Sequence, residues 1–233
     1  TDWQDRNLTK SVTTGQGDSG DTDVIFLTGV NQKHSGVELE TNYMVNDMLD
    51  LMFVASFGNW KFDGDANGNY QETEYNSEGQ AIGYTTTEYA YALDGLYVGD
   101  MPQTSYVLGV TLKPIKDLRI QAIHKMYDKN YSDWSPSARE FDGTNDDADR
   151  AQVWEAPSYN RLDLHMSYKL PKVKDLDMML TANIFNVLDE VYVQDAVDNS
   201  QYNGYGSKQH LPHNAEVFLG TPRYANIGLS IGF

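Results

Sequence analysis

The chain has 233 residues, a formal net charge of −17 and a pI near 4.4; 40% of its residues are hydrophobic and its mean hydropathy is −0.56. A chain this acidic disfavours nucleic acid as a partner, because phosphates require a basic surface, and the absence of cysteine excludes disulfides, thiol chemistry and cysteine-bound zinc. No stretch approaches the ~18 consecutive apolar residues of a membrane-spanning helix. No Walker loop, HExxH helix or nucleophile elbow is present, and we expect no enzymatic activity.

The first residues, 1–6, read as the middle of a strand. They contain neither an initiator methionine nor a signal peptide. We therefore expect the chain to be a fragment of a longer protein, with the missing part lying N-terminal.

Apolar and polar residues then alternate along most of the chain with the period of two that is typical of strands. Residues 36–43 place Val37 and Leu39 opposite Glu38 and Glu40, and residues 161–170 alternate in the same way. The last segment, TPRYANIGLSIGF, has the most regular alternation. The sequence predicts about eight strands, at 2–12, 23–44, 50–62, 101–114, 118–130, 158–170, 176–194 and 222–233.

Short and long connections between these strands take turns. The short ones are charged and the long ones are polar, with short connections at 45–48, 115–117 and 173–175 and long ones at 64–100, 132–156 and 196–221. Tight turns at one end and long loops at the other indicate an all-β fold of antiparallel transmembrane β-barrel strands, with apolar side chains toward lipid and polar ones toward the lumen. A soluble β-sandwich also alternates, but it would not usually separate loop lengths so regularly.

One of the predicted long loops opens on DGDANGNYQETE, residues 63–74. Counted from the first aspartate, oxygen-bearing residues occupy positions 1, 3, 5, 7, 9 and 12, with glycine at position 6, which is the ligand order of an EF-hand loop. The flanks form no helices, so a helix–loop–helix sensor is rejected. We expect an acidic extracellular loop that can bind Ca²⁺, although no cofactor is required; the candidate ligands are Asp63, Asp65, Asn67, Asn69, Gln71 and Glu74. The alternative is that these are ordinary loop residues in an acidic protein.

Aromatic residues and histidines are the other candidates in the long loops. Planar rings suit sugars or chelate rings, so the aromatic residues are candidates for ligand binding, with packing among loops or an interfacial belt as the alternative; they are Trp134, Phe141, Trp154, Tyr202, Tyr205 and Phe218. His210 and His213 are three residues apart with a proline between them and lie on no helix face, which favours loop packing over metal or haem ligation.

The last two predicted strands resemble the C-terminal end of TonB-dependent outer-membrane receptors. In that family the penultimate strand carries an Asn-based signature, here NIFNVLD at 183–189, and the final strand opens after Pro-Arg and closes on an aromatic residue, here Phe233. Further matches are SGVELETNY at 35–43, GLYVGDMPQTSYVLGVTLKP at 95–114 and APSYNRLDLHMSYKL at 156–170, which look most like receptors of the Bacteroidetes group.

This resemblance implies a plugged barrel of about 22 strands, of which residues 1–233 would be the C-terminal portion. The plug and the TonB box would lie in the absent N-terminal part. It also implies a location in the outer membrane of a Gram-negative bacterium, with outer-membrane lipid, TonB and a small-molecule ligand as partners. The aromatic C-terminal residue Phe233 resembles the signal that the barrel-assembly machinery reads.

We therefore expect a receptor for energy-coupled uptake of a scarce ligand, such as a ferric siderophore or another nutrient. The rival hypothesis is a secreted, calcium-dependent β-sandwich module that binds carbohydrate. It explains the acidic motif and the loop aromatics, but not the alternation of loop lengths.

Overall fold

In a computed structural model, residues 1–14, 21–141, 148–199 and 209–232 are described. They form an almost entirely β structure with one four-residue helix, α1 (Pro136–Arg139), and one 3-10 turn, η1 (Pro212–Asn214). Among these residues, no helix is long and apolar enough to cross a lipid bilayer. The strands are β1 (Asp2–Thr14), β2 (Asp21–Asn46), β3 (Leu49–Phe62), β4 (Ala66–Tyr75), β5 (Ala81–Tyr91), β6 (Thr104–Leu112), β7 (Leu118–Asp128), β8 (Asn130–Tyr131), β9 (Asp133–Trp134), β10 (Glu140–Phe141), β11 (Glu155–Ala156), β12 (Tyr159–Lys169), β13 (Asp177–Phe185), β14 (Val193–Asp198), β15 (Glu216–Leu219) and β16 (Tyr224–Gly232).

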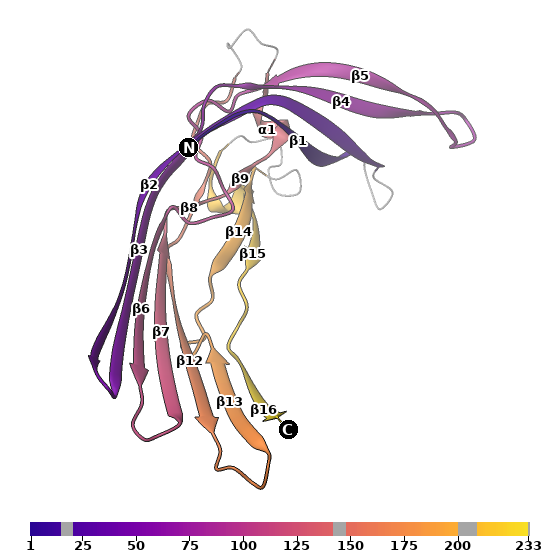
Figure 1. Ribbon diagram of the computed structural model, residues 1–233. Coiled ribbons are helices and arrows are strands. Elements are labelled where there is room, and N and C mark those ends of the chain that lie inside the picture. The colour runs from indigo at the N-terminus through magenta and orange to yellow at the C-terminus, as the bar shows by residue number, and fades with distance from the viewer. Residues whose placement is uncertain (15–20, 142–147, 200–208, 233) are drawn as a thin grey trace.

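A curved antiparallel sheet in the order β2-β3-β6-β7-β12-β13-β16 forms the main wall (Figure 1). Its strands are joined by the three predicted short turns at one end and by long connections at the other. The positions of the eight predicted strands and the alternation of loop lengths are therefore confirmed, except that β13 ends at Phe185, not at 194. The predicted number of strands is too low, because the described residues form sixteen and several short ones lie within the predicted loops. The wall stays open in the described residues, with β16 at one edge.

The wall has one apolar face and one polar face. The strand register places apolar side chains next to one another on a common outer face. Leu164 pairs with Ala122 and Ile184, and Ala182 pairs with Ile227. Exposed apolar residues continue across this face, among them Val37, Leu39, Leu108, Leu229 and Ile231. An apolar surface of this extent has to be covered, in a membrane protein by lipid.

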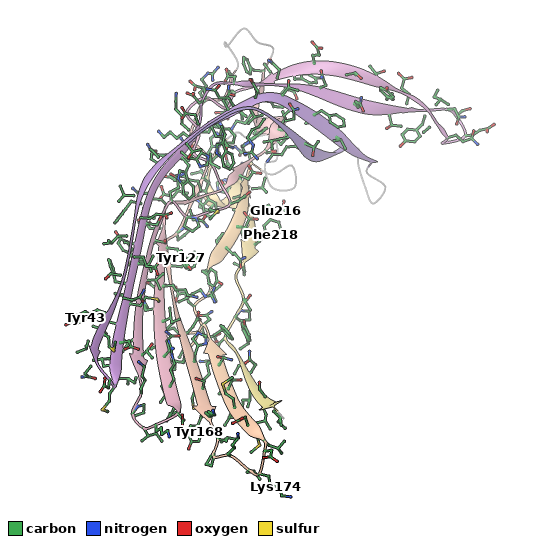
Figure 2. All side chains as sticks on the ribbon, in the orientation of Figure 1. Tyr43, Tyr127, Tyr168, Lys174, Glu216 and Phe218 are labelled. Atoms are coloured by element: carbon green, nitrogen blue, oxygen red, sulfur yellow. The ribbon has the colours of Figure 1, made fainter. Side chains whose placement is uncertain are left out.

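Two tyrosines lie on the outer face near the short turns. Tyr43 and Tyr168 are both seen at that end of the wall in Figure 2, and their alternation with Asn42 and Ser167 assigns them to the apolar side. Tyrosine combines an apolar ring with a polar tip, so this position is typical of an interfacial aromatic belt.

β2 is longer than its neighbours and changes partners along its length. The last part of β2, from Gln32 on, pairs with β3, and its Val24–Thr28 part pairs with β4 on the same side. The opposite side of β2 pairs with β1. β3 and β4 therefore form one continuous line. Between the pairs Gln32↔Phe62 and Thr28↔Asn67 the β3–β4 side has one residue more than β2, which makes a bulge at residues 63–65. Gly64, with φ +99°, supplies the left-handed backbone that this bulge requires.

The structure corrects the prediction that residues 64–100 form a loop. Most of this segment is a regular hairpin, β4–β5, paired from Ala66↔Tyr91 to Tyr75↔Ala81 and projecting away from the wall (Figure 1). Apolar alternation could not reveal it, because the strand sequences NYQETEY and AIGYTTTEY are polar on both faces.

The remaining long connections fold over the polar face at the end opposite the short turns, in what we call the loop layer: residues 92–103, 129–141, 148–158, 186–199 and 209–223. Small sheets hold it together, with β8 pairing β11, and β14 lying between β15 and a parallel β9. Its core joins the wall through Phe62 and the hairpin through Tyr91, and both residues pack with Trp134. The side covered by this layer is the concave, lumenal face.

Candidate functional site

A ladder of polar side chains crosses the lumenal face at the last three strands of the wall. His165 Nδ1 on β12 lies 2.8 Å from Asn183 Oδ1 on β13, and Asn183 Nδ2 donates to Asn226 Oδ1 on β16 at 2.8 Å. The side chains meet because the register aligns His165 with Asn183 and Asn183 with Asn226. This part of the lumenal wall is therefore hydrogen-bonded across strands.

Basic side chains gather next to this ladder, on β7 and β12. Lys125 Nζ donates to Asp163 Oδ2 at 2.9 Å, and Arg161 Nη2 lies 3.7 Å from Asp163 Oδ1. Asp163 is 1% exposed and also accepts a 2.9 Å hydrogen bond from the backbone N–H of Asn186. Arg119 shares the lumenal face by alternation and is exposed. Lys125 and Arg161 thus share one carboxylate, and we call these two residues together with Arg119 the cationic sector.

The terminal-strand signature has a structural role. Asn186 is fully buried at φ +50°, and its amide donates to the carbonyls of Glu190 at 2.9 Å and Thr221 at 3.2 Å. Its side-chain oxygen accepts from the Glu190 N–H. Asp189 in turn accepts a 2.9 Å hydrogen bond from the backbone N–H of Arg223. These contacts, which we call the Asn186 clamp, attach the segment leading into β16 to the end of β13.

Trp134 does not lie at a ligand-accessible surface. Its side chain is 2% exposed, packs against Phe62 and Tyr91, and has the Lys10 ammonium 4.7 Å from its ring. The structure thus corrects its assignment as a ligand-binding residue: its ring fills the core of the loop layer. Phe141 is likewise buried, with the Arg150 guanidinium over its ring.

The other predicted loop aromatics have different positions. Trp154 is half-buried, and its carbonyl accepts hydrogen bonds from the backbone and hydroxyl of Ser132. Phe218 is exposed on β15 (Figure 2). Tyr202 and Tyr205, and also Phe233, lie outside the described residues, so their predicted roles stay predictions.

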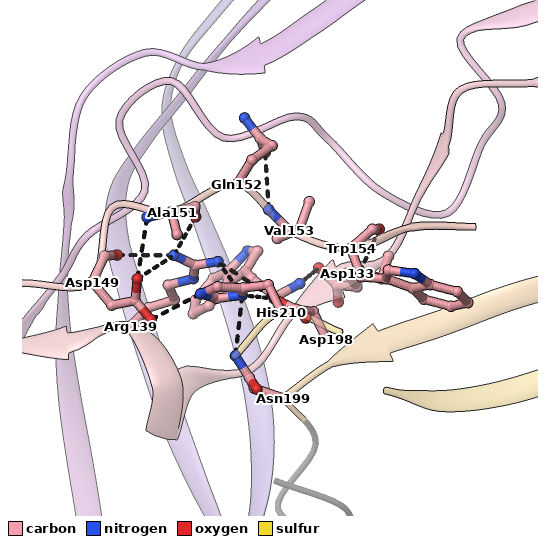
Figure 3. Close-up of polar contacts among 12 residues, drawn as sticks. Asp133, Arg139, Asp149, Ala151, Gln152, Val153, Trp154, Asp198, Asn199 and His210 are labelled. Carbon is pink, nitrogen blue, oxygen red and sulfur yellow. Dashed lines mark hydrogen bonds and ion pairs between the residues drawn. The ribbon is translucent and has the colours of Figure 1, made fainter. Parts of the chain in front are cut away.

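A buried ion cluster lies in the loop layer, and the sequence had not predicted it (Figure 3). Arg139 at the end of α1 is fully buried and donates to the carbonyls of Asp149 at 2.9 Å and Ala151 at 2.7 Å. Its Nη2 lies 3.4 Å from Asp198 Oδ2, and His210 bridges Asp198 and Asp149, with Nε2 2.9 Å from Asp149 Oδ2. We call these four side chains the Arg139 cluster.

The charges of this cluster balance when His210 is protonated. Two carboxylates then face two cations, and the hydrogen bond to Asp198 raises the pKa of His210 above its ordinary value, against the opposing effect of burial. The cluster joins the long connection between β7 and β12, which carries Arg139 and Asp149, to the long connection between β13 and β16, which carries Asp198 and His210. One signal in the sequence could have suggested this cluster. Arg139 and Arg150 are the only basic residues between 130 and 160, so each can be expected to pair with an acidic residue of the same acidic region.

The acidic motif at 63–74 does not form a calcium loop. Asp63 pairs with Lys33 at 2.7 Å, and Asp65 binds Arg150 and the N–H groups of Leu93 and Asp94. Glu74 bonds Thr85 at the far end of β4, roughly 25–30 Å from Asp65 at the rise of a strand. Asn67, Asn69 and Gln71 lie along β4 between them. An extended strand cannot bring six ligands to one ion, and among the described residues no group of three acidic or histidine side chains is arranged so that it could hold a metal ion.

A wall with an apolar outer face, a polar lumenal face, tight turns at one end and a folded loop layer at the other defines an outer-membrane type β-barrel. The family model "TonB dependent receptor-like, beta-barrel" matches residues 3–187. The chain therefore belongs to the TonB-dependent receptors, a family of outer-membrane receptors and transporters of Gram-negative bacteria. No curated protein matches the chain. Family membership also rejects the rival β-sandwich hypothesis.

Proposed function

We propose that the chain is part of a receptor for TonB-coupled uptake of a scarce small ligand across the outer membrane, and that the ligand is an anionic chelate such as a ferric siderophore. The cationic sector carries this proposal. Lys125 and Arg161 face the lumen and share the carboxylate of Asp163, and Arg119 lies on the same face beside the Lys113–Asp50 ion pair, in a chain whose net charge is −17. A local excess of positive charge in a concave, low-dielectric wall attracts anions.

Transport is the test of this proposal. Cells with the complete receptor should accumulate a radiolabelled ferric siderophore, and accumulation should cease when TonB is removed. Replacing Lys125 and Arg161 together by glutamine should weaken uptake by about tenfold, whereas Ser230→Ala, on the lumenal face outside the cationic sector, should not. Equal uptake by cells that lack the receptor, or by the double variant, would contradict the proposal.

We also propose that the barrel-assembly machinery recognises the last strand through Phe233. The regular alternation that ends on this aromatic residue supports the proposal. Deleting Phe233 should lower the amount of folded receptor in the outer membrane more than it changes the affinity of the receptor that remains. Normal levels of folded receptor after the deletion would overturn this role.

A further inference from the structure

Arg119 lies apart from the other two residues of the cationic sector. On β7 it precedes Lys125 by six residues, which is about 20 Å along a strand. The row of the polar ladder lies between the two positions: the Gln121 amide donates to Thr111 Oγ1 at 3.1 Å, and the register sets Gln121 beside His165. Arg119 therefore marks a separate position on the lumenal face, close to the short turns.

Arg119 lines a cavity of about 450 Å³ on the lumenal face. The charged side chains of this cavity are Arg119, Lys113 and Asp50, and Lys113 Nζ lies 2.6 Å from Asp50 Oδ2. Arg119 is exposed, and within the part of the chain that the structure describes its guanidinium forms no ion pair or hydrogen bond. One cation of the cavity is thus neutralised by a carboxylate, whereas the other is available to an anion.

The β2–β3 side of this cavity carries two methionines, Met44 and Met52. Met52 lies across Gly109, its partner in the register, because a Cβ at Gly109 would come within 2.9 Å of Met52 Cε. Met44 is exposed. Thioether side chains are flexible and adapt to apolar groups of irregular shape. A guanidinium on one side and two thioethers on the other fit an anionic group that belongs to a partly apolar molecule.

The same two basic residues, Lys113 and Arg119, also line a second cavity, of about 580 Å³. Its other lining residues belong to the first and second short turns, among them Met48 and Lys116. Short turns of outer-membrane barrels face the periplasm. Arg119 and Lys113 therefore lie where the lumenal wall meets the periplasmic rim.

We propose that Arg119 and Lys113 form a second anion-binding site, which receives the anionic group of the transported ligand after that group has left Lys125 and Arg161. The inference rests on the proposed function, and it adds a site, its position before release and its ligand chemistry. The ligand group is an oxyanion such as a carboxylate, which a guanidinium binds through two parallel hydrogen bonds. Two weak sites in sequence let a ligand enter and also leave, whereas one tight site would retain it.

The first test measures the site without transport, in the complete receptor in detergent. Ser167→Cys places a reporter thiol directly across from Arg119 in the register. Its reaction with a negatively charged and with a positively charged methanethiosulfonate reagent is followed by mass spectrometry of the peptide that contains residue 167. We expect the anionic reagent to react faster, and citrate, a tricarboxylate added at constant ionic strength, to slow that reaction.

Adding Arg119→Gln to the reporter should lower the ratio of the two rates about tenfold, because one unit charge nearby acts with opposite sign on the two reagents. It should also remove the protection by citrate. Arg119→Lys keeps the charge and should keep both effects. Lys174→Gln removes a lysine from the third short turn, which lines neither cavity, and is the matched control that should change neither. An unchanged ratio in Arg119→Gln, or citrate protection that persists in it, would overturn the proposal.

The second test uses cells that carry the complete receptor and a radiolabelled ferric siderophore. Arg119→Gln should lower the maximal rate of uptake about fivefold and leave the half-saturating concentration unchanged, because the site acts after the ligand has bound. Arg119→Lys should restore the rate. Uptake by Arg119→Gln at the wild-type rate would overturn the role in transport. Failure of the wild type to take up the siderophore would contradict the proposed function and with it this step, whereas the rate ratio and the citrate protection would still decide whether the anion site exists.

Discussion

Arg150 donates two hydrogen bonds of 2.8 Å to the two carboxylate oxygens of Asp65, which lies 85 residues earlier in the chain. Asp65 also accepts hydrogen bonds from the backbone N–H groups of Leu93 and Asp94, at 3.0 and 3.1 Å. One carboxylate therefore ties together the bulge at 63–65, the segment that follows β5 and the loop that carries Arg150. The hydrogen bond from Arg150 holds the pKa of Asp65 below its ordinary value.

The first prediction concerns this pair. Asp65→Asn and Arg150→Gln should each accelerate hydrogen exchange at the Leu93 and Asp94 amides. A double-mutant cycle should give a coupling free energy of about 1 kcal/mol, because both side chains are partly exposed and water screens their attraction. Purely additive effects of the two substitutions would contradict the coupling.

Calcium provides the second prediction. Because Asp65 is bound to Arg150 and Glu74 lies at the other end of β4, the two carboxylates do not share an ion in this structure. Calorimetric titration with Ca²⁺ should give the same heats for the wild type and for Asp65→Ala combined with Glu74→Ala. Loss of saturable calcium binding in the double variant would restore the calcium-loop hypothesis.

The third prediction is a pH dependence of the loop layer. The pKa of His210 is raised in the folded state, so its contribution to stability is fully present below the ordinary histidine value near 6.5 and is lost as the pH rises through the higher folded value. Hydrogen exchange at 148–153, corrected for its intrinsic pH dependence, should report more frequent opening at about pH 8 than at about pH 5. His210→Gln should reduce this difference, whereas His213→Gln, at an exposed position, should leave it unchanged. An unchanged difference in His210→Gln would assign the pH dependence to other groups.

The fourth prediction concerns the outer face. Leu164 lies in the middle of β12 with Ala122 and Ile184 on either side. Leu164→Lys in the complete receptor should destabilise the barrel by roughly 2–4 kcal/mol if the residue lies near the bilayer midplane. Ser167→Lys, on the lumenal face of the same strand, should have a much smaller effect. Spin labels at 162, 164 and 166 should be less accessible to water-soluble quenchers than labels at 161, 163 and 165, and the reverse order would contradict the assignment of the two faces.

The fifth prediction concerns the Asn186 clamp. Asn186→Ala removes a fully buried side chain that makes three hydrogen bonds to the backbone of Glu190 and Thr221. Leaving those groups without partners should destabilise the barrel by about 1–3 kcal/mol, measured as a lower temperature for the mobility shift of the folded receptor in gel electrophoresis. Asn226→Ala is the control at an exposed position. Equal shifts for the two variants would show that the Asn186 clamp stabilises the barrel no more than an exposed asparagine does.

The sequence by itself determined the wall. Alternation at period two, the order of short and long connections and the terminal signature predicted the strands and their two faces, because each depends on side chains that are close in sequence. A strand that faces lipid on one side and water on the other must alternate, and this requirement is local.

Only the tertiary structure decided what the polar segments do. The motif at 63–74 has the ligand spacing of a calcium loop, but pairing with β2 and β5 extends it into a strand, and its carboxylates find Lys33, Arg150 and Thr85 instead. Arg139 joins Asp149, Asp198 and His210 across 71 residues, and no period in the sequence connects them. Ion pairs and strand partners depend on which distant segments meet, and that is fixed by the folded chain as a whole.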